Sequence, residues 1–247
     1  PMLSTYSTHP DVTKKGSYIF RLCFIDSFQG QVMSSFAFNE LNARTAAVLV
    51  NASSSYSETL SDFFQDGFVQ KGGKILFRED YVDDEKNFRP IVERLLPLKP
   101  DAVFVPGNIV DSGRLIKQAR DMGMKAFFLG GDGWGSSMFA HAGSAIHGGY
   151  FSVHWHPGND SETSRDFVIG FKGFPHKEPP DSGTALAHDA VFLLADAVRR
   201  AGSLDREKIR EEIAATIEFQ GVTGTISFNR DRNPVKPAVI LKFENFK

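Results

Sequence analysis

With 247 residues, 41% of them hydrophobic and 23% charged, the chain has an ordinary globular composition and enough sequence for one large domain or two modest ones. The formal net charge of −2 and the lack of a polybasic run exclude nucleic acid and a membrane surface as partners, and no apolar stretch approaches the roughly 20 residues of a transmembrane helix. The one cysteine, Cys23, cannot form an intrachain disulfide; it leaves cytosol and periplasm both open, and we expect it to be a small buried side chain.

The first residues, Pro1 to Thr5, read like the inside of a strand, although a domain rarely begins on a core element. They do not have the pattern of a signal peptide. We therefore expect further residues upstream of Pro1 in the intact protein.

Between residues 44 and 130, apolar runs of strand length alternate with segments of helical periodicity. The runs are apolar along their whole length, which is typical of strands buried on both faces, so the alternation predicts a parallel sheet covered by helices on both sides. The expected strands are residues 46–50, 74–77, 102–105 and 126–129. The expected helices are residues 54–71, residues 86–96 and a segment that Asp111 caps and Gly123 closes.

The second half of the chain lacks this regular rhythm, and no internal repeat is visible. Either Ser203 or Asp205 can cap the last predicted helix. The expected elements are a strand at 149–154, helices at 161–173, 184–201 and 205–216, and strands at 224–228 and 238–243.

Polar side chains follow the predicted strands at the points where they end. In an open parallel sheet, ligands bind beyond the carboxyl ends of the strands, so residues in these loops are expected to be neighbours in space. Their hydroxyls, aromatic ring, amide and single carboxylate suit a small polar ligand with a positive charge, such as an ammonium group. The candidates are Tyr56, Asn108 and Asp132 after three of the strands, and Tyr6, Ser7 and Thr8 after the opening strand.

The stretch Gly130-Gly131-Asp132-Gly133-Trp134 also has a plainer interpretation. An Asp among glycines often bonds its own backbone or caps the next helix. Tyr56 can equally be a core residue of its helix, and Trp134 is more often a packing residue than a ligand contact. Residue patterns alone leave these alternatives open.

Motifs for other chemistry are weak or absent. The glycines after residue 130 do not match GxGxxG, and neither a P-loop nor a GxSxG elbow is present, so phosphate binding and serine hydrolysis lack support. His154 and His156 alternate along a strand as a metal pair could, but no spaced carboxylate or thiol accompanies them. We expect no metal and no cofactor.

Taken together, several stretches resemble branched-chain amino-acid ABC transporter substrate-binding proteins, the leucine/isoleucine/valine type with periplasmic binding protein fold type I. Each stretch alone is unspecific, but the set spans the whole chain. The stretches are Thr8-x-Pro10, YIFRLCFIDSFQG from Tyr18 to Gly30, Ser54-Ser55-Tyr56-Ser57, Gly130-Gly131-Asp132-Gly133-Trp134, and GVTGTISF from Gly221 to Phe228.

This resemblance implies two doubly wound α/β lobes, each with a parallel sheet, joined by three crossovers and closing on a ligand. The first lobe would hold residues 1–26 and 156–223, and the second residues 27–154 and 225–247. The first lobe would be incomplete, because members of the family begin with an N-terminal segment that this chain lacks.

The resemblance also implies roles for the candidate residues. The acidic residue at the Asp132 position receives the ligand's ammonium group, the Thr8 position and main chain near Tyr6 contact the ligand, and the Tyr56 position offers an aromatic ring. The Asn108 and His188 positions are often aromatic in the family. Asn and His there would make the pocket more polar than one for a branched aliphatic side chain.

The function implied is a solute-binding protein without catalysis, periplasmic or lipid-anchored outside the cell, that delivers an amino acid or related amine to an ABC permease. The alternative is a ligand-sensing regulatory domain of the same fold that acts on a protein partner. An enzyme is a third hypothesis, with no motif to support it.

Overall fold

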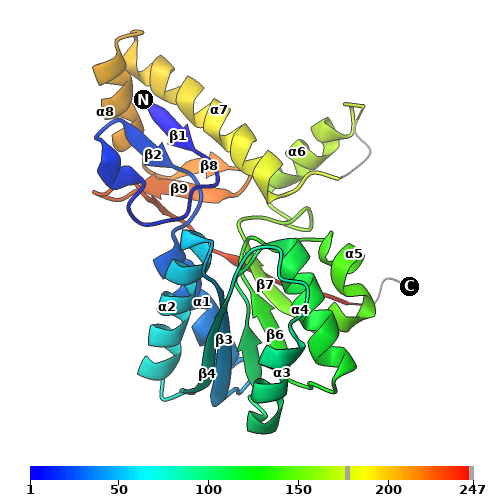
Figure 1. The fold of residues 1–247 in the computed structure, drawn as a ribbon. Helices are drawn as coiled ribbons and strands as arrows, with labels where there is room; N and C mark the ends of the chain where they lie inside the picture. The colour runs from blue at the N-terminus through cyan, green and yellow to red at the C-terminus, as the bar shows by residue number, and fades with distance from the viewer. Residues whose placement is uncertain (176–178, 245–247) are drawn as a thin grey trace. The chain divides into compact units, whose positions relative to one another are not determined.

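The computed structural model describes residues 1–175 and 179–244. The chain forms two compact units, and both are discontinuous in sequence (Figure 1). The first unit consists of Pro1–Ile25 and Val153–Val239, and the second of Asp26–Ser152 and Ile240–Lys247.

The second unit is built on a sheet with strand order β11-β7-β6-β5-β3-β4. From β4 to β7 every neighbouring pair is parallel, which confirms the predicted parallel sheet. The strands are β3 (Thr45–Asn51), β4 (Lys74–Tyr81), β5 (Ala102–Phe104), β6 (Phe127–Gly130), β7 (Tyr150–Val153) and β11 (Val239–Lys242).

Helices cover both faces of this sheet, with α1 and α2 on one side and α3, α4 and α5 on the other (Figure 1). On the α1/α2 side, Val48 and Val50 of β3 share a core cluster with Leu60, Phe64 and Phe68 of α2. The helices are α1 (Asp26–Asn39), α2 (Ser55–Gln70), α3 (Arg89–Leu95), α4 (Ile109–Asp121) and α5 (Met138–Ala142), with short 3₁₀ helices at Leu96–Leu98 and Gly143–Ile146.

The start of α4 corrects one prediction. Asn108, not Asp111, is the N-cap, because its side-chain Oδ1 accepts a hydrogen bond of 2.9 Å from the backbone N–H of Asp111. Asp111 therefore lies inside the first turn of the helix. The cap of α2 is Ser54, whose hydroxyl accepts from the backbone N–H of Ser57.

The first unit contains two small sheets and a long helix. The strands β1 (Met2–Ser4) and β2 (Ile19–Arg21) pair in parallel, and β8 (Phe219–Gly221), β9 (Gly224–Phe228) and β10 (Pro234–Val235) form the order β10-β9-β8. The helices are α6 (Glu162–Phe171), α7 (Ser182–Ala201) and α8 (Arg206–Ala214), with a 3₁₀ helix at Thr13–Lys15. Asp205 caps α8, which settles the choice between Ser203 and Asp205.

The core of this unit joins the two sheets to the helices. Phe20 and Cys23 are fully buried in one cluster with Leu186 and Leu193 of α7 and Ile226 of β9. The prediction that Cys23 is a buried hydrophobic residue is thus confirmed.

The units differ from the predicted lobes in one stretch. Residues 225–239 were expected in the second lobe, yet β9 pairs with β8 and β10 with β9, so this stretch groups with the first unit. The other boundaries of the units lie within a few residues of the predicted ones. The assignment of these units as the lobes of a binding protein stays a prediction.

Across the part of the chain that the structure describes, we find no helix with the length and apolar character needed to span a membrane.

Candidate ligand-binding site

Asp132 lies just past the carboxyl end of β6, and its carboxylate is held from two other elements. It is 6% exposed. Its Oδ1 accepts a hydrogen bond of 2.8 Å from Gln29 Nε2, on α1, and one of 2.9 Å from the Tyr56 hydroxyl, on α2. The proximity of Tyr56 and Asp132 predicted from the strand ends is confirmed.

Gln29 contacts Asp132 at a second point. The backbone N–H of Asp132 donates to Gln29 Oε1 at 3.1 Å, so one amide group binds both the side chain and the main chain of the same residue. Gln29 is completely buried. The loop after β6 is therefore tied to the first turns of α1.

The Tyr56 hydroxyl bridges the same loop. It donates to Asp132 and accepts a hydrogen bond of 3.2 Å from the backbone N–H of Gly133. Burial, and secondarily the negative charge of Asp132, raises the pKa of Tyr56 well above its ordinary value of 10. The phenol thus remains a protonated donor at neutral pH.

The glycine before Asp132 makes this packing possible. A Cβ on Gly131 would lie 2.1 Å from Gln29 Oε1 and 2.4 Å from the Tyr56 hydroxyl. Trp134, by contrast, is 3% exposed and packs near Phe243, so its interpretation as a packing residue is confirmed.

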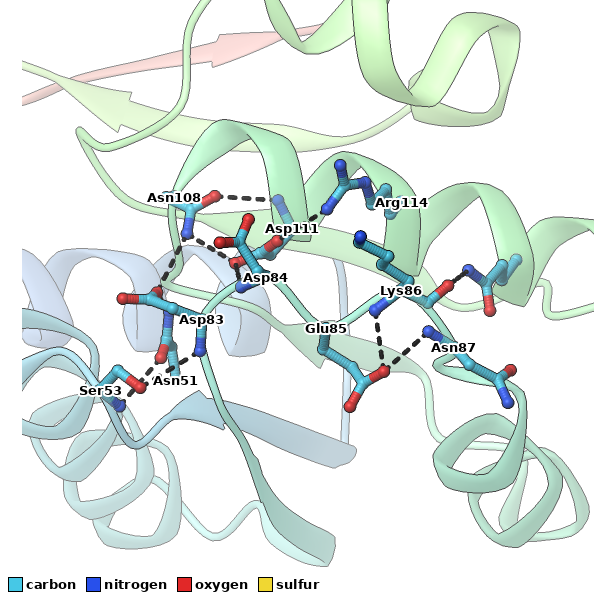
Figure 2. Close-up of polar contacts among 11 residues, drawn as sticks. Asn51, Ser53, Asp83, Asp84, Glu85, Lys86, Asn87, Asn108, Asp111 and Arg114 are labelled. Atoms are coloured by element: carbon cyan, nitrogen blue, oxygen red, sulfur yellow. Dashed lines mark hydrogen bonds and ion pairs between the residues drawn. The ribbon is translucent and has the colours of Figure 1, made fainter.

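Asn108 belongs to a neighbouring polar network rather than to the hydrogen bonds of Asp132. Besides capping α4, its Nδ2 donates to Asp111 Oδ2 at 2.8 Å and reaches Asp83 Oδ1 at 3.5 Å (Figure 2). Asp83 in turn accepts a hydrogen bond of 2.7 Å from Asn51 Nδ2 at the end of β3.

The same network closes around Asp111, which is 1% exposed. Its Oδ2 also accepts from the backbone N–H of Asp84 at 3.2 Å, and its Oδ1 lies 3.4 Å from Arg114 Nη1 (Figure 2). These bonds link the ends of β3 and β4 to the start of α4. The amide oxygen and the amide nitrogen of Asn108 both take part in these hydrogen bonds.

Of the candidates in the first unit, Tyr6, Ser7 and Thr8 lie in one loop after β1. Arg21, which is fully buried at the end of β2, holds this loop: its Nη1 donates to the carbonyl oxygens of Ser7 at 2.7 Å and His9 at 2.8 Å. Thr8 is 5% exposed, whereas Tyr6 is 46% exposed.

His188 lies on α7 in the same unit. Its ring stacks on Phe192 with centroids 4.3 Å apart and meets Phe167 edge-on at 5.0 Å. Its Nδ1 is 3.6 Å from Asp189 Oδ1. The structure therefore places His188 among aromatic side chains.

His154, one member of the histidine pair, is 1% exposed and packs against Phe24 and Tyr6. Within residues 1–175 and 179–244, no group of three or more His, Cys, Asp or Glu side chains is arranged to hold a metal ion.

A sequence profile of the family described as periplasmic binding protein matches residues 1–246. The chain belongs to the periplasmic binding protein family. This membership agrees with the resemblance that the sequence motifs indicated, and the relatives and solved structures described next confirm that resemblance and the type I fold.

A named relative of the chain is described as an amino-acid-binding protein. The Leu/Ile/Val-binding protein homolog 1 of Brucella abortus (strain 2308) is 28% identical over 243 residues, which are 97% of this chain and 64% of the relative. The chain thus spans a little under two thirds of the length of that relative.

Two solved structures have the same fold as this binding protein. A leucine-binding protein, LivK, from Thermotoga maritima MSB8 is 33% identical with a TM-score of 0.93, over 99% of this chain and 70% of that one. The branched-chain amino-acid transporter substrate-binding protein LivJ from Streptococcus pneumoniae, in complex with isoleucine, is 29% identical with a TM-score of 0.89, over 99% and 69% of the two chains.

Two residues that hold candidate ligand contacts in place were not among the sequence candidates. Gln29 and Arg21 both lie in the stretch from Tyr18 to Gly30, which the resemblance rested on without giving either a role. Neither follows a strand as a loop residue. For Arg21 the signal that could have found it is a large polar residue in an apolar run, because a polar side chain that is buried must find a partner. Gln29 stands between Phe28 and Gly30 in a mixed stretch and has no such signal.

Proposed function

We propose that the chain binds an amino acid or a related small amine, without catalysis, as the solute-binding component of an ABC importer. The observation that carries this proposal is the buried Asp132 carboxylate at the carboxyl edge of a parallel sheet, held by two neutral donors. Gln29 and Tyr56 orient this carboxylate and are themselves uncharged. A ligand ammonium group at this carboxylate forms a charge-assisted hydrogen bond of the strong class.

The relatives support the amino-acid class. The Brucella protein is named for Leu/Ile/Val binding and the Thermotoga protein for leucine binding, and the Streptococcus structure holds isoleucine. These names describe binding and transporter proteins and not regulatory domains, so they do not favour the sensing alternative. Delivery to an ABC permease, and a location outside the cytoplasm in the periplasm or on a lipid anchor, follow from the family as parts of the proposal.

The proposal assigns candidate ligand contacts to each unit by itself. From the second unit, Asp132 receives the ammonium group and Tyr56 presents its ring. Asn108 contacts the ligand only through atoms that its hydrogen bonds to Asp83 and Asp111 leave exposed. From the first unit come the loop of Tyr6, Ser7 and Thr8, and His188 on α7. We take the two units as the lobes of the binding protein.

A thermal-shift panel tests the function. The panel contains L-leucine, L-isoleucine, L-valine, several polar amino acids, putrescine and benzoate. A ligand that binds only the folded state raises the Tm with its concentration, by about 2.7 kcal/mol of added stability at 100 times Kd. We expect an amino acid to raise the Tm. A panel in which benzoate alone does so, or in which no compound does, would overturn the proposal.

A further inference from the structure

Gln29 is placed to control where the Asp132 carboxylate points. The two residues are 103 positions apart in the chain. Gln29 Nε2 donates to Asp132 Oδ1 at 2.8 Å, and Gln29 Oε1 accepts from the backbone N–H of Asp132 at 3.1 Å. Tyr56 also donates to Asp132 Oδ1, at 2.9 Å, but through its hydroxyl alone. Two bonds from one rigid planar amide, one to the side chain and one to the main chain, restrict the rotation of the carboxylate about its side-chain torsions.

The amide of Gln29 is itself fixed. The residue is fully buried on α1, and this helix packs closely on α2. The missing side chain of Gly131 leaves room for its Oε1, since a Cβ there would lie 2.1 Å away. Because Gln29 is neutral, it orients the carboxylate without cancelling its negative charge.

We infer that Gln29 is a positioning residue of this site: with Tyr56 it holds Asp132 for the ligand's ammonium group and thereby raises the preference for ligands that carry one over ligands that lack it. This inference rests on the proposed function. It goes further in separating the residue that contacts the ligand from the residue that determines how well the contact is made. A merely structural Gln29 would affect all ligands alike.

The test compares two probes that differ only in the ammonium group. L-Leucine and 4-methylpentanoate share their carbon skeleton and carboxylate, and the second lacks the amine. Calorimetry gives Kd for both, and their ratio is the amine preference. The variants are Gln29→Leu, which removes both bonds at similar size, and Gln29→Glu, which keeps an acceptor but loses the Nε2 donor and adds a negative charge.

The chain offers a matched control in Gln118 of α4. Its amide also binds at two points in the same unit: Oε1 accepts from the backbone N–H of Phe88 at 2.8 Å, and Nε2 donates to the carbonyl oxygen of Lys86 at 2.9 Å. Neither bond involves Asp132. Gln118→Leu therefore removes an equivalent pair of amide hydrogen bonds at a site to which we assign no role in the amine preference.

We expect Gln29→Leu to weaken L-leucine binding about tenfold or more, the size of a lost hydrogen bond to a charged group, while 4-methylpentanoate changes by less than about twofold. Gln118→Leu should lower the Tm and leave the ratio of the two Kd values unchanged. Equal weakening of both probes in Gln29→Leu, or an unchanged ratio, would overturn the inference.

A wild-type chain that binds both probes equally would overturn the proposed function itself, which keeps the two failures distinct. Should Gln29→Leu not fold, Gln29→Glu provides the same comparison at nearly the original shape, with loss of the amine preference expected and its retention contradicting the inference. Amide hydrogen exchange gives a readout without ligand: the N–H of Asp132 should exchange faster in Gln29→Leu than in Gln118→Leu, and equal rates would count against the inference.

Discussion

The Tyr56 hydroxyl and the Asp132 carboxylate meet in a hydrogen bond of 2.9 Å, although 76 residues of chain separate them. The same hydroxyl accepts the backbone N–H of Gly133 at 3.2 Å. One phenol thus binds the side chain of Asp132 and the peptide group that follows it. The bond joins α2 to the loop after β6, which is where the proposed ligand contact lies.

Tyr56→Phe removes this bridge and keeps the ring. We expect a loss of about 1 kcal/mol in the free energy of unfolding and roughly tenfold weaker binding of L-leucine, because one donor to a charged group is lost. Urea unfolding and calorimetry measure the two effects. Tyr81→Phe is the control, since it removes another buried phenol hydroxyl of the same unit, at the end of β4. Equal loss of leucine affinity in both variants would contradict the role of Tyr56.

Gly131→Ala should disrupt the site through packing alone. The new methyl group would collide with Gln29 Oε1 at 2.1 Å and with the Tyr56 hydroxyl at 2.4 Å, and Gln29 is fully buried and cannot swing into solvent. We expect about 1–3 kcal/mol of destabilisation, the usual cost of overpacking, together with loss of ligand binding. Gly135→Ala is matched in chemistry and meets nothing within 4 Å, so it should behave like the wild type. A stable Gly131→Ala variant with normal binding would disprove this packing.

Much of the second unit could be predicted because several of its strands, such as β3 and β5, are almost entirely apolar. The run predicted at 46–50 is β3, Thr45–Asn51, and the predicted helix 54–71 is α2, Ser55–Gln70. β4 continues past the predicted Phe77 to Tyr81 through charged residues. It is the last strand of the sheet order, and an edge strand can expose such side chains to water.

The helix α1 was not predicted as an element, and its composition explains why. Gln29, Gly30 and Ser34 are buried on its inner face, so no apolar period marks that face. A Cβ on Gly30 would lie 2.5 Å from Phe63 Cβ, which shows how closely α1 approaches α2. Helices that pack through small and polar residues are not visible to a search for hydrophobic periodicity.

The candidate site was predictable where it depends on strand ends and not where it depends on helices. The loops after β3 and β6 correctly indicated that Tyr56 and Asp132 are neighbours. Asn108 also follows a strand, but its side chain bonds within its own network. Gln29 comes from a helix interior, and only the tertiary packing brings it to Asp132. The ligand-binding roles of all these residues stay predictions.

Asp189 joins α7 to the turn at Val222 and Thr223 in the first unit, much as Asp132 joins the loop after β6 to α1 and α2 in the second. Its Oδ1 accepts the backbone N–H of Val222 at 2.7 Å, and its Oδ2 accepts the backbone N–H and the hydroxyl of Thr223 at 2.9 and 2.7 Å. Asp189→Ala should cost about 3–5 kcal/mol in the free energy of unfolding, because buried donors lose a charged acceptor. The surface control Asp196→Ala, which breaks exposed pairs with Arg199 and Arg200, should cost about 1 kcal/mol or less. Similar losses in the two variants, measured by urea unfolding, would refute this account.

Lys236 should give the stability of the protein a measurable pH dependence. Its ammonium group is buried and donates to the Thr223 hydroxyl, and burial lowers its pKa to about 8 from an ordinary value of 10.5. Between these two values the unfolded chain binds more protons than the folded one, so the free energy of unfolding rises with pH. The full difference is about 3 kcal/mol.

Lys236→Met provides the comparison. Urea unfolding of both proteins at pH 7.5 and pH 10 isolates the contribution of Lys236, because all other titrating groups are common to the two. The wild type should gain up to about 3 kcal/mol relative to the variant between these pH values. A difference that does not change with pH would show that Lys236 has the same proton affinity in both states, and one that moves in the opposite direction would show that folding raises its pKa; either result would contradict this prediction.

The central claim is that the Asp132 carboxylate receives the ammonium group of the ligand, and calorimetry with L-leucine on Asp132→Ala and Asp132→Asn tests it most directly. Asn keeps the shape of the side chain and removes its charge. The account predicts that both variants weaken L-leucine binding by about 2–4 kcal/mol, as expected when one member of a buried charge pair is lost. Binding of L-leucine at wild-type affinity by a folded Asp132→Asn variant would contradict it.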